Sequence, residues 1–270
     1  MVSKIKFWGF QKLNNFFKNN KGLTLVEILV ASVIGSITVA AIYYSFGIFS
    51  NTYLGIVSKV QVSKDIRNAL TVITKDVRLA GYTSKIPTQS GGVSFAPFTT
   101  MNNKIIIRKN TYFNQNSTPG SYASGSNDVL EIIYDRDRST RVRVSYAQSN
   151  DGFLKKRLSR CLNADCLGDS DYVYNETGFY DYQPIAGQGL EGFKVTAFNA
   201  AGTELAFSQA NQAQFIRVSV LYSSVNNGDV HKTEQQQTFK VEELTVSKND
   251  RIFRDMASVL IYPRNIQALK

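Results

Sequence analysis

The sequence predicts an α+β protein, in which one long N-terminal helix packs on a head of antiparallel β-strands. Three observations lead to this prediction. Residues 23–58 form an apolar run with one Asp, Glu, Lys, Arg or His among them, Glu27. An amphipathic pattern without proline then continues to residue 80. After residue 82 the pattern changes to short strand-like runs separated by Gly, Asn, Ser and Pro.

The composition describes a folded chain with a single membrane segment. Of its 270 residues, 43% are hydrophobic and 19% are charged, which argues against intrinsic disorder. One long apolar run rules out several membrane passes. The formal net charge is +10, but the first 22 residues contain five lysines and no acid. Half of the excess charge therefore belongs to this leader and says little about the partners of the remaining chain.

The apolar run is long enough to cross a membrane, which takes about 20 helical residues. Lysines precede it, and the next basic residue is Lys59. The positive-inside rule then places residues 1–22 in the cytoplasm and the bulk of the chain across the membrane. A secretory signal peptide fits less well than a signal anchor, because its apolar core spans only about 7–15 residues. An acid inside such a helix is costly and by default functional, so Glu27 requires a partner.

Beyond residue 58 the helical pattern becomes amphipathic. Apolar side chains recur every three or four residues, and charged side chains fall elsewhere around the helix. Gly81 follows as a C-terminal stop, and Pro87 prevents much continuation. We therefore predict one helix of about 55–58 residues, about 85 Å long at 1.5 Å per residue. The apolar set is Ile66, Leu70, Ile73, Val77 and Ala80, and the charged set is Lys64, Asp65, Arg67, Lys75, Asp76 and Arg78.

The rest of the chain, residues 82–270, is predicted to form the β-rich head. Asn227-Gly228 is a two-residue hairpin signal, and residues 110–127 and 161–188 are predicted to be long loops. We expect an antiparallel sheet laid against the C-terminal half of the helix. The predicted strands are residues 104–109, 128–135, 141–147, 189–199 and 214–224, completed by residues 237–247 and 253–262.

Residues 21–27, KGLTLVE, resemble the type IV prepilin motif, in which a dedicated peptidase cuts after the glycine. The usual form has Phe where this chain has Leu23. The resemblance implies a pilin fold, cleavage between Gly22 and Leu23 by the prepilin peptidase, and methylation of the new terminus at Leu23. Glu27 then becomes the family's acid at the fifth mature position. It is implied to pair with the terminal amine of a neighbouring subunit and to set the axial register, because pairing offsets the cost of both buried charges.

This resemblance divides the chain into four parts. Residues 1–22 are a cleaved leader, and residues 23–57 are a transmembrane helix that later lies in the filament core. Residues 58–81 are the amphipathic extension of that helix, and residues 82–270 are the extracytoplasmic head. The implied location is the inner membrane, crossed once, and then the cell surface as part of the pilus.

Parts of the head narrow the resemblance. RNALTVITKDVRLAGY, QPIAGQGLEGFKVTAF, FIRVSVLY and FRDMASVLIYPRN occur in that order. They look like segments of PilW-like minor pilins and of the J-type minor pseudopilins of type II secretion. A PilW-like minor pilin that primes assembly near the pilus tip is the favoured interpretation, and a J-type pseudopilin is the alternative. The implied partners are the prepilin peptidase, other minor pilins, the major pilin, the inner-membrane assembly platform and membrane lipid.

Two cysteines and one histidine limit the chemistry of the chain. Cys161 and Cys166 lie five positions apart in a polar stretch. If the head lies outside the cytoplasm, a disulfide between them is favoured, and on the chain-entropy model it adds about 2 kcal/mol. Two free thiols remain the alternative. A zinc site needs about four ligands, and His231 is the single histidine, so we expect no metal and no cofactor.

Enzymatic activity is not predicted. The sequence contains no phosphate-binding glycine loop, nucleophile elbow or histidine–carboxylate set. An acidic cluster suggests calcium, but Tyr174 occupies the twelfth loop position, where a glutamate is expected. A solvated loop is therefore preferred over a calcium site. The cluster is Asn163, Asp165, Asp169 and Asp171.

A basic stretch in the head raises the alternative of DNA binding during uptake. Aromatic side chains interleave it, as in surfaces that hold nucleic-acid phosphates. Aspartates also lie among the cations, and the alternation RVRV is what a half-exposed strand gives anyway, so a solvated strand face is preferred. Adhesion at a pilus tip is a third alternative without a named ligand. The candidate DNA contacts are Arg136, Arg138, Arg141, Arg143, Lys155, Lys156 and Arg157, with Arg160 beside them.

Overall fold

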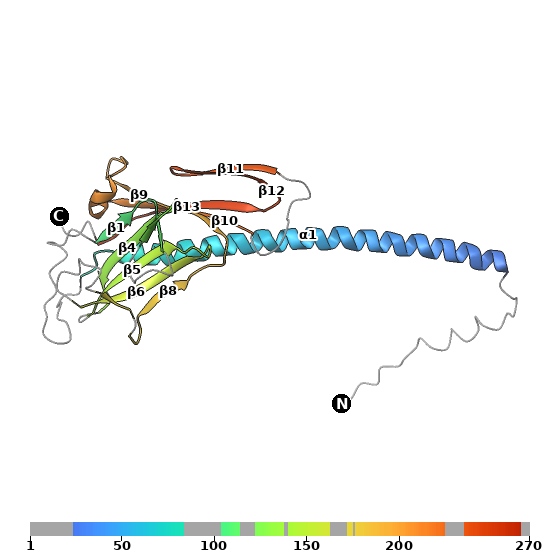
Figure 1. Cartoon of the computed structure of the whole chain (residues 1–270), viewed down its shortest axis with the longest axis horizontal. Coiled ribbons are helices and arrows are strands. Elements are labelled where there is room, and N and C mark those ends of the chain that lie inside the picture. The colour runs from blue at the N-terminus through green and yellow to red at the C-terminus, as the bar shows by residue number, and fades with distance from the viewer. Residues whose placement is uncertain are drawn as a thin grey trace, which may run out of the picture. The chain divides into compact units, whose positions relative to one another are not determined.

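A computed structural model describes residues 24–83, 104–113, 122–137, 140–162, 172–174, 176–224 and 235–265 of the chain. One long helix, α1 (Leu25–Leu79), precedes a set of antiparallel strands (Figure 1). The predicted α+β class is confirmed. The chain divides into two compact units, Met1–Thr52 and Tyr53–Lys270.

Helix α1 has 55 residues, which confirms the single long helix expected from the sequence. It stops where predicted, because Gly81 adopts a left-handed backbone with φ of 72° and glycine reaches this conformation at no steric cost. The Tyr82 amide donates to the Leu79 carbonyl at 2.8 Å, and the Gly81 amide donates to the Ile133 carbonyl at 3.0 Å. The end of the helix is thereby fastened to a strand of the head.

The head contains two main sheets. The first runs in the order β1 (Ile105–Arg108), β4 (Val129–Asp135), β5 (Arg141–Gln148), β6 (Leu154–Cys161) and β7 (Tyr172–Val173), and β8 (Tyr180–Pro184) also pairs with β6. The second runs β13 (Arg254–Ile261), β10 (Phe215–Ser223) and β9 (Leu190–Phe198), and η2 (Phe207–Gln212) is a short 3₁₀ helix. Two hairpins add β2 (Thr111–Phe113) with β3 (Tyr122–Ser124) and β11 (Gln235–Val241) with β12 (Leu244–Asp250).

The second part of α1 packs against both sheets in one hydrophobic core. Its apolar stripe is buried as predicted at Ile66, Ile73, Val77 and Ala80, and Leu70 packs partly buried against the same cluster. Removal of this stripe from water supplies the main driving force that joins helix and head, at about 25 cal/mol for each Å² of apolar surface. The strand residues of this core include Ile132, Val144, Tyr146, Phe193, Val195, Val218 and Val220.

The sequence interpretation placed the two acids of the amphipathic segment on its polar side, and this was wrong. Asp65 and Asp76 are buried against the head. Asp65 accepts a hydrogen bond from the Gly187 amide at 3.0 Å. A Cβ at Gly187 would lie 2.5 Å from the Asp65 carboxylate, so this close approach requires glycine. Both acids flank the apolar stripe at positions three helical turns apart, which brings each of them to the head.

Several predicted elements differ from the structure. Residues 237–247 are not one strand but parts of β11 and β12, joined at Glu242, whose φ is 55°. The two predicted loops contain the short strands β2, β3, β7 and β8 within their described residues. Strand β6 was missed because its four cations hide the alternation of a strand. The Asn227-Gly228 hairpin signal lies outside the described residues.

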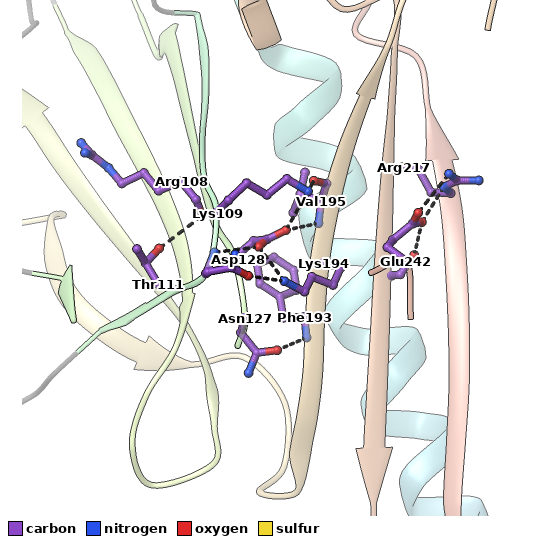
Figure 2. A network of polar contacts seen from close by, with 12 residues as sticks. Arg108, Lys109, Thr111, Asn127, Asp128, Phe193, Lys194, Val195, Arg217 and Glu242 are labelled. Atoms are coloured by element: carbon purple, nitrogen blue, oxygen red, sulfur yellow. Dashed lines mark hydrogen bonds and ion pairs between the residues drawn. The ribbon is translucent and has the colours of Figure 1, made fainter. Parts of the chain in front are cut away.

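The two main sheets are joined by a polar junction at the start of β4, which Figure 2 shows. Asn127 and Asp128 face the outer edge of β9 and act as a substitute for a neighbouring strand. The Phe193 amide donates to the Asn127 side-chain oxygen at 2.7 Å, and the Asp128 amide donates to the Phe193 carbonyl at 2.9 Å. The Val195 amide donates to the Asp128 carboxylate at 3.0 Å. Backbone groups of an edge strand are thus satisfied without a further strand.

Two lysines neutralise Asp128 inside this junction. The Lys194 ammonium lies 3.1 Å and the Lys109 ammonium 3.3 Å from its carboxylate (Figure 2). Lys109 also donates to the Val195 carbonyl at 2.9 Å. Asp128 has no exposed surface, and Lys194 is 2% exposed. A buried carboxylate needs such partners, because an unpaired charge in a protein interior is costly.

Replacing Asp128 with Asn should destabilise the head by about 3 kcal/mol or more, because Lys194 then loses its buried counter-charge. We would measure the free energy of unfolding of the detergent-solubilised chain in urea. Glu176→Gln is the matched control, since its pair with Arg160 at 2.8 Å is partly solvated and should contribute at most about 1 kcal/mol. Equal stability of the two variants would contradict the role given to the junction.

Candidate assembly site

The first turn of α1 holds the acid that sequence analysis singled out. The Thr24 amide donates to the Glu27 carboxylate at 2.8 Å, and the Thr24 hydroxyl donates to the same oxygen at 3.0 Å. In return the Glu27 amide donates to the Thr24 hydroxyl oxygen at 3.3 Å. This reciprocal arrangement is a capping box, which satisfies amides that the start of a helix leaves free. The other carboxylate oxygen of Glu27 has no partner among the described residues.

The part of α1 that follows Glu27 exposes apolar side chains on every side. Large apolar residues remain about half or more exposed along it, for example Leu25 at 79%, Ile37 at 64% and Phe49 at 75%. In the described part of the chain, α1 is long and apolar enough to cross a membrane. A helix that is apolar all round is stable only when lipid or other helices cover it. This segment is therefore a surface for membrane and for neighbouring helices.

The predicted cleavage residues, Gly22 and Leu23, lie outside the described residues, so cleavage and methylation remain predictions. The structure adds that α1 begins at Leu25, two residues after the predicted bond.

The cations predicted to contact DNA do not form one surface. Strands β5 and β6 pair so that Ser145 faces Arg157 and Tyr146 faces Lys156. Because side chains alternate between faces of a sheet, Arg141, Arg143 and Arg157 lie on one face and Lys156 lies on the other. Lys156 points to the helix, where its ammonium is 2.6 Å from the Asp76 carboxylate.

Four of the candidate cations, Arg141, Arg143, Lys155 and Arg157, are buried and have partners within the head. Arg141 has no exposed surface and pairs with Asp135 at 2.7 Å. Arg143 pairs with buried Glu131, and Lys155 pairs with Asp151 at 2.8 Å. The predicted half-exposed strand is thus buried on both faces.

Aromatic rings and carboxylates complete this layer. The Arg157 guanidinium lies 4.8 Å from the centre of the Tyr182 ring. Arg160 pairs with Glu176 at 2.8 Å. Arg136 is exposed and donates to the Gly178 carbonyl at 3.3 Å, while Arg138 lies outside the described residues.

A carboxylate of the helix also meets a buried phenol. The Tyr146 hydroxyl donates to Asp76, beside the ion pair of Asp76 with Lys156. Burial, together with the negative charge of Asp76, raises the pKa of Tyr146 well above its ordinary value, so the phenol stays protonated and keeps donating. The sequence signal for this contact is the position of Asp76 directly beside the apolar stripe.

Cys161 is disulfide-bonded in the structure. Its predicted partner, Cys166, lies outside the described residues, as does the acidic cluster Asn163, Asp165, Asp169 and Asp171. Their pairing and the calcium alternative therefore stay predictions. Among the residues that the structure describes, no group of three or more His, Cys, Asp or Glu is placed to hold a metal ion.

Comparison with known proteins identifies the N-terminal segment. Residues 17–43 match the family model described as the prokaryotic N-terminal methylation motif. Among solved structures, the chain is similar to the type IV-like pilin TTHA1219 from Thermus thermophilus, with 12% identity and a TM-score of 0.43 over 76% of this chain and 98% of that chain. No curated protein matches the chain.

The matched motif ends within the exposed apolar part of α1. Together these two features describe a membrane-anchored chain with a prepilin-type N-terminus. The N-terminal segment of the chain is thus similar to that of type IV prepilins. The motif implies processing by a prepilin peptidase and assembly with other pilins.

Arg141→Gln should lower the free energy of unfolding by about 3 kcal/mol, because it leaves Asp135 buried without its cation. Arg136→Gln, five residues earlier and exposed, should change it by no more than about 0.5 kcal/mol. Urea unfolding of the solubilised chain would separate the two variants. Retention on DNA should be unaffected by either substitution, and a selective loss of retention in Arg141→Gln with unchanged stability would restore the DNA hypothesis.

Proposed function

We propose that this chain is a minor pilin of a type IV pilus, cleaved between Gly22 and Leu23 and methylated at Leu23. In this proposal residues 23–57 hold it in the inner membrane until it is extracted into the filament. It acts with other minor pilins and the assembly platform to prime the filament, near the tip. The observation that supports this best is the methylation motif at the start of an uncovered apolar helix.

The choice of a minor subunit rests on the head. Cleavage after Gly22 leaves residues 23–270, which is large for a major pilin. The four head and helix-end segments quoted above occur in the same order as in PilW-like proteins. A J-type minor pseudopilin of type II secretion is the alternative. The two alternatives share the same processing and the same helix packing, so they differ in the machinery and not in the physical mechanism.

The Glu27 geometry supports a role in subunit register. The capping box holds the carboxylate at the first turn of α1 through one oxygen, and its other oxygen remains available. A neighbouring terminal amine that donates to this oxygen would pair two charges that are each costly in an apolar environment. Register is set because only one axial offset brings the two groups together.

Intact-mass spectrometry of the protein from its native membrane tests the processing. We expect a mass that begins at Leu23, with one added methyl group and two hydrogens fewer for the disulfide. A full-length mass with free thiols would overturn the proposal, since the leader would then be retained and the head would not lie in an oxidising compartment.

Two substitutions at Glu27 separate its charge from its capping role. Glutamine at this position can still complete a capping box but has no charge, whereas alanine removes both. If register depends on the ion pair, Glu27→Gln and Glu27→Ala should both reach normal processing and both reduce incorporation into sheared pili about tenfold or more. Wild-type incorporation of Glu27→Gln, with a defect in Glu27→Ala, would assign the residue to capping alone.

A further inference from the structure

The face of α1 turned away from the head carries a row of cations. We call Lys64, Arg67, Lys75 and Arg78 the cationic stripe, and all four are exposed. Their spacings of three and eight residues place them within an arc of about 80° on a helix of 3.6 residues per turn. The buried stripe of Val62, Ile66, Ala69, Ile73 and Val77 lies on the opposite side.

The acids of the same segment cannot neutralise this row. From Ser58 to Leu79, Asp65 and Asp76 are the two acids in the sequence, and both are turned into the head. Asp65 is bound by the Gly187 amide and Asp76 by Lys156. Between Lys64 and Arg78 the fold therefore separates the charges of α1, with the negative side chains against the head and the positive ones on the opposite face.

The four cations of the stripe lack ion-pair partners in the described part of the chain, unlike many cations of the head. The cations of the sheets form ion pairs repeatedly, as Arg141 does with Asp135, Lys194 with Asp128 and Arg254 with Glu191. Because cations elsewhere in the head are paired within the chain, even in the core, the four unpaired cations of the stripe are available to bind a partner.

Membrane lipid does not fit the position of the stripe. Along the helix, Lys64 lies about 10 Å and Arg78 about 32 Å beyond Val57, at 1.5 Å per residue. The headgroup layer on each side of a bilayer is only about 5–8 Å deep. The stripe thus lies beyond the headgroups when the exposed apolar half of the same helix spans the hydrocarbon.

A second copy of this chain does not fit either. Two such helices packed side by side in parallel would bring like charges together along about 21 Å, and like-charge contacts disfavour association. Screening weakens this repulsion beyond about 8 Å at physiological ionic strength, but not at contact distances. The stripe is complementary to a helix with acidic residues at the same spacing.

We propose that the cationic stripe binds the acidic face of the α1 helix of a different pilin, and that it disfavours contact between copies of this chain. The proposal rests on the proposed function, since the partner helix runs beside α1 through the apolar half and then meets the stripe. Charge complementarity of this kind selects partners and suppresses wrong ones.

Site-specific photo-crosslinking in native membranes tests this proposal with the full chain. A photoreactive amino acid replaces Thr71, which is exposed between Arg67 and Lys75, one turn from each. We expect crosslinks to a peptide from the α1 helix of another pilin with Asp or Glu at three- and four-residue spacing. In the Arg67→Glu, Lys75→Glu double variant these crosslinks should fall about tenfold.

A matched double variant controls for net charge. Lys240→Glu with Lys248→Glu changes the same number of exposed charges on the hairpin of β11 and β12 and should leave the Thr71 crosslinks unchanged. Crosslinks to a second copy of this chain, to lipid or to nucleic acid, or crosslinks insensitive to the Arg67→Glu, Lys75→Glu change, would overturn the proposal.

These outcomes are distinct from failure of the proposed function. If the chain starts at Leu23 and enters sheared pili, but the Thr71 crosslinks do not change in the Arg67→Glu, Lys75→Glu variant, the minor pilin proposal stands. The stripe is then not a partner surface. A chain that retains its leader would lose the proposed function whatever Thr71 contacts.

Discussion

Burial of one face of α1 beneath two separate sheets is the constraint on which the head depends. Each sheet has its own hydrogen-bond ladder, and the core they share is completed by the helix stripe from Val62 to Ala80. The two sheets therefore need an additional connection at a place the helix does not reach. Asn127 and Asp128 provide it by bonding the outer edge of β9, with lysines that cancel the buried charge.

The burial of so many cations follows from the same arrangement. Strand β5 lies between β4 and β6 in the sheet, with the helix core on one face, and both of its faces are buried. Polar residues on its outer face cannot reach solvent, so Arg141 and Arg143 take carboxylates from β4 as partners. A buried pair of this kind adds little to stability by itself, but removal of either member is costly. The pairs thus fix which residues may lie opposite each other, and so the register of β4 and β5.

Sequence patterns predicted the elements whose periodicity is strong. The long helix, its end at Gly81 and the strands β1, β4, β5, β9, β10 and β13 were predicted in type and approximate position. Strand β6 was not, because Lys155, Lys156, Arg157 and Arg160 look like a solvated surface until their partners are known. Those partners, such as Asp76 and Asp151, come from several elements, and a single sequence does not show long-range pairing. At the assembly site, Glu27 was identified by its cost in an apolar helix, whereas the capping bond from Thr24 depends on local geometry.

The attachment of α1 to the head also has a mechanical meaning. A pull along the helix axis acts parallel to the packed stripe, so the contacts from Ser58 to Ala80 resist it together rather than one after another. At the far end the Gly81 amide donates to the Ile133 carbonyl, and the Asp135 amide donates to the Tyr82 carbonyl at 2.9 Å, which fastens the residues after the last turn to β4. Force delivered through the helix is therefore spread over a long shear interface and passed into a central part of the sheet. A head joined to its anchor in this way can be drawn out of a membrane by its helix without being peeled from it.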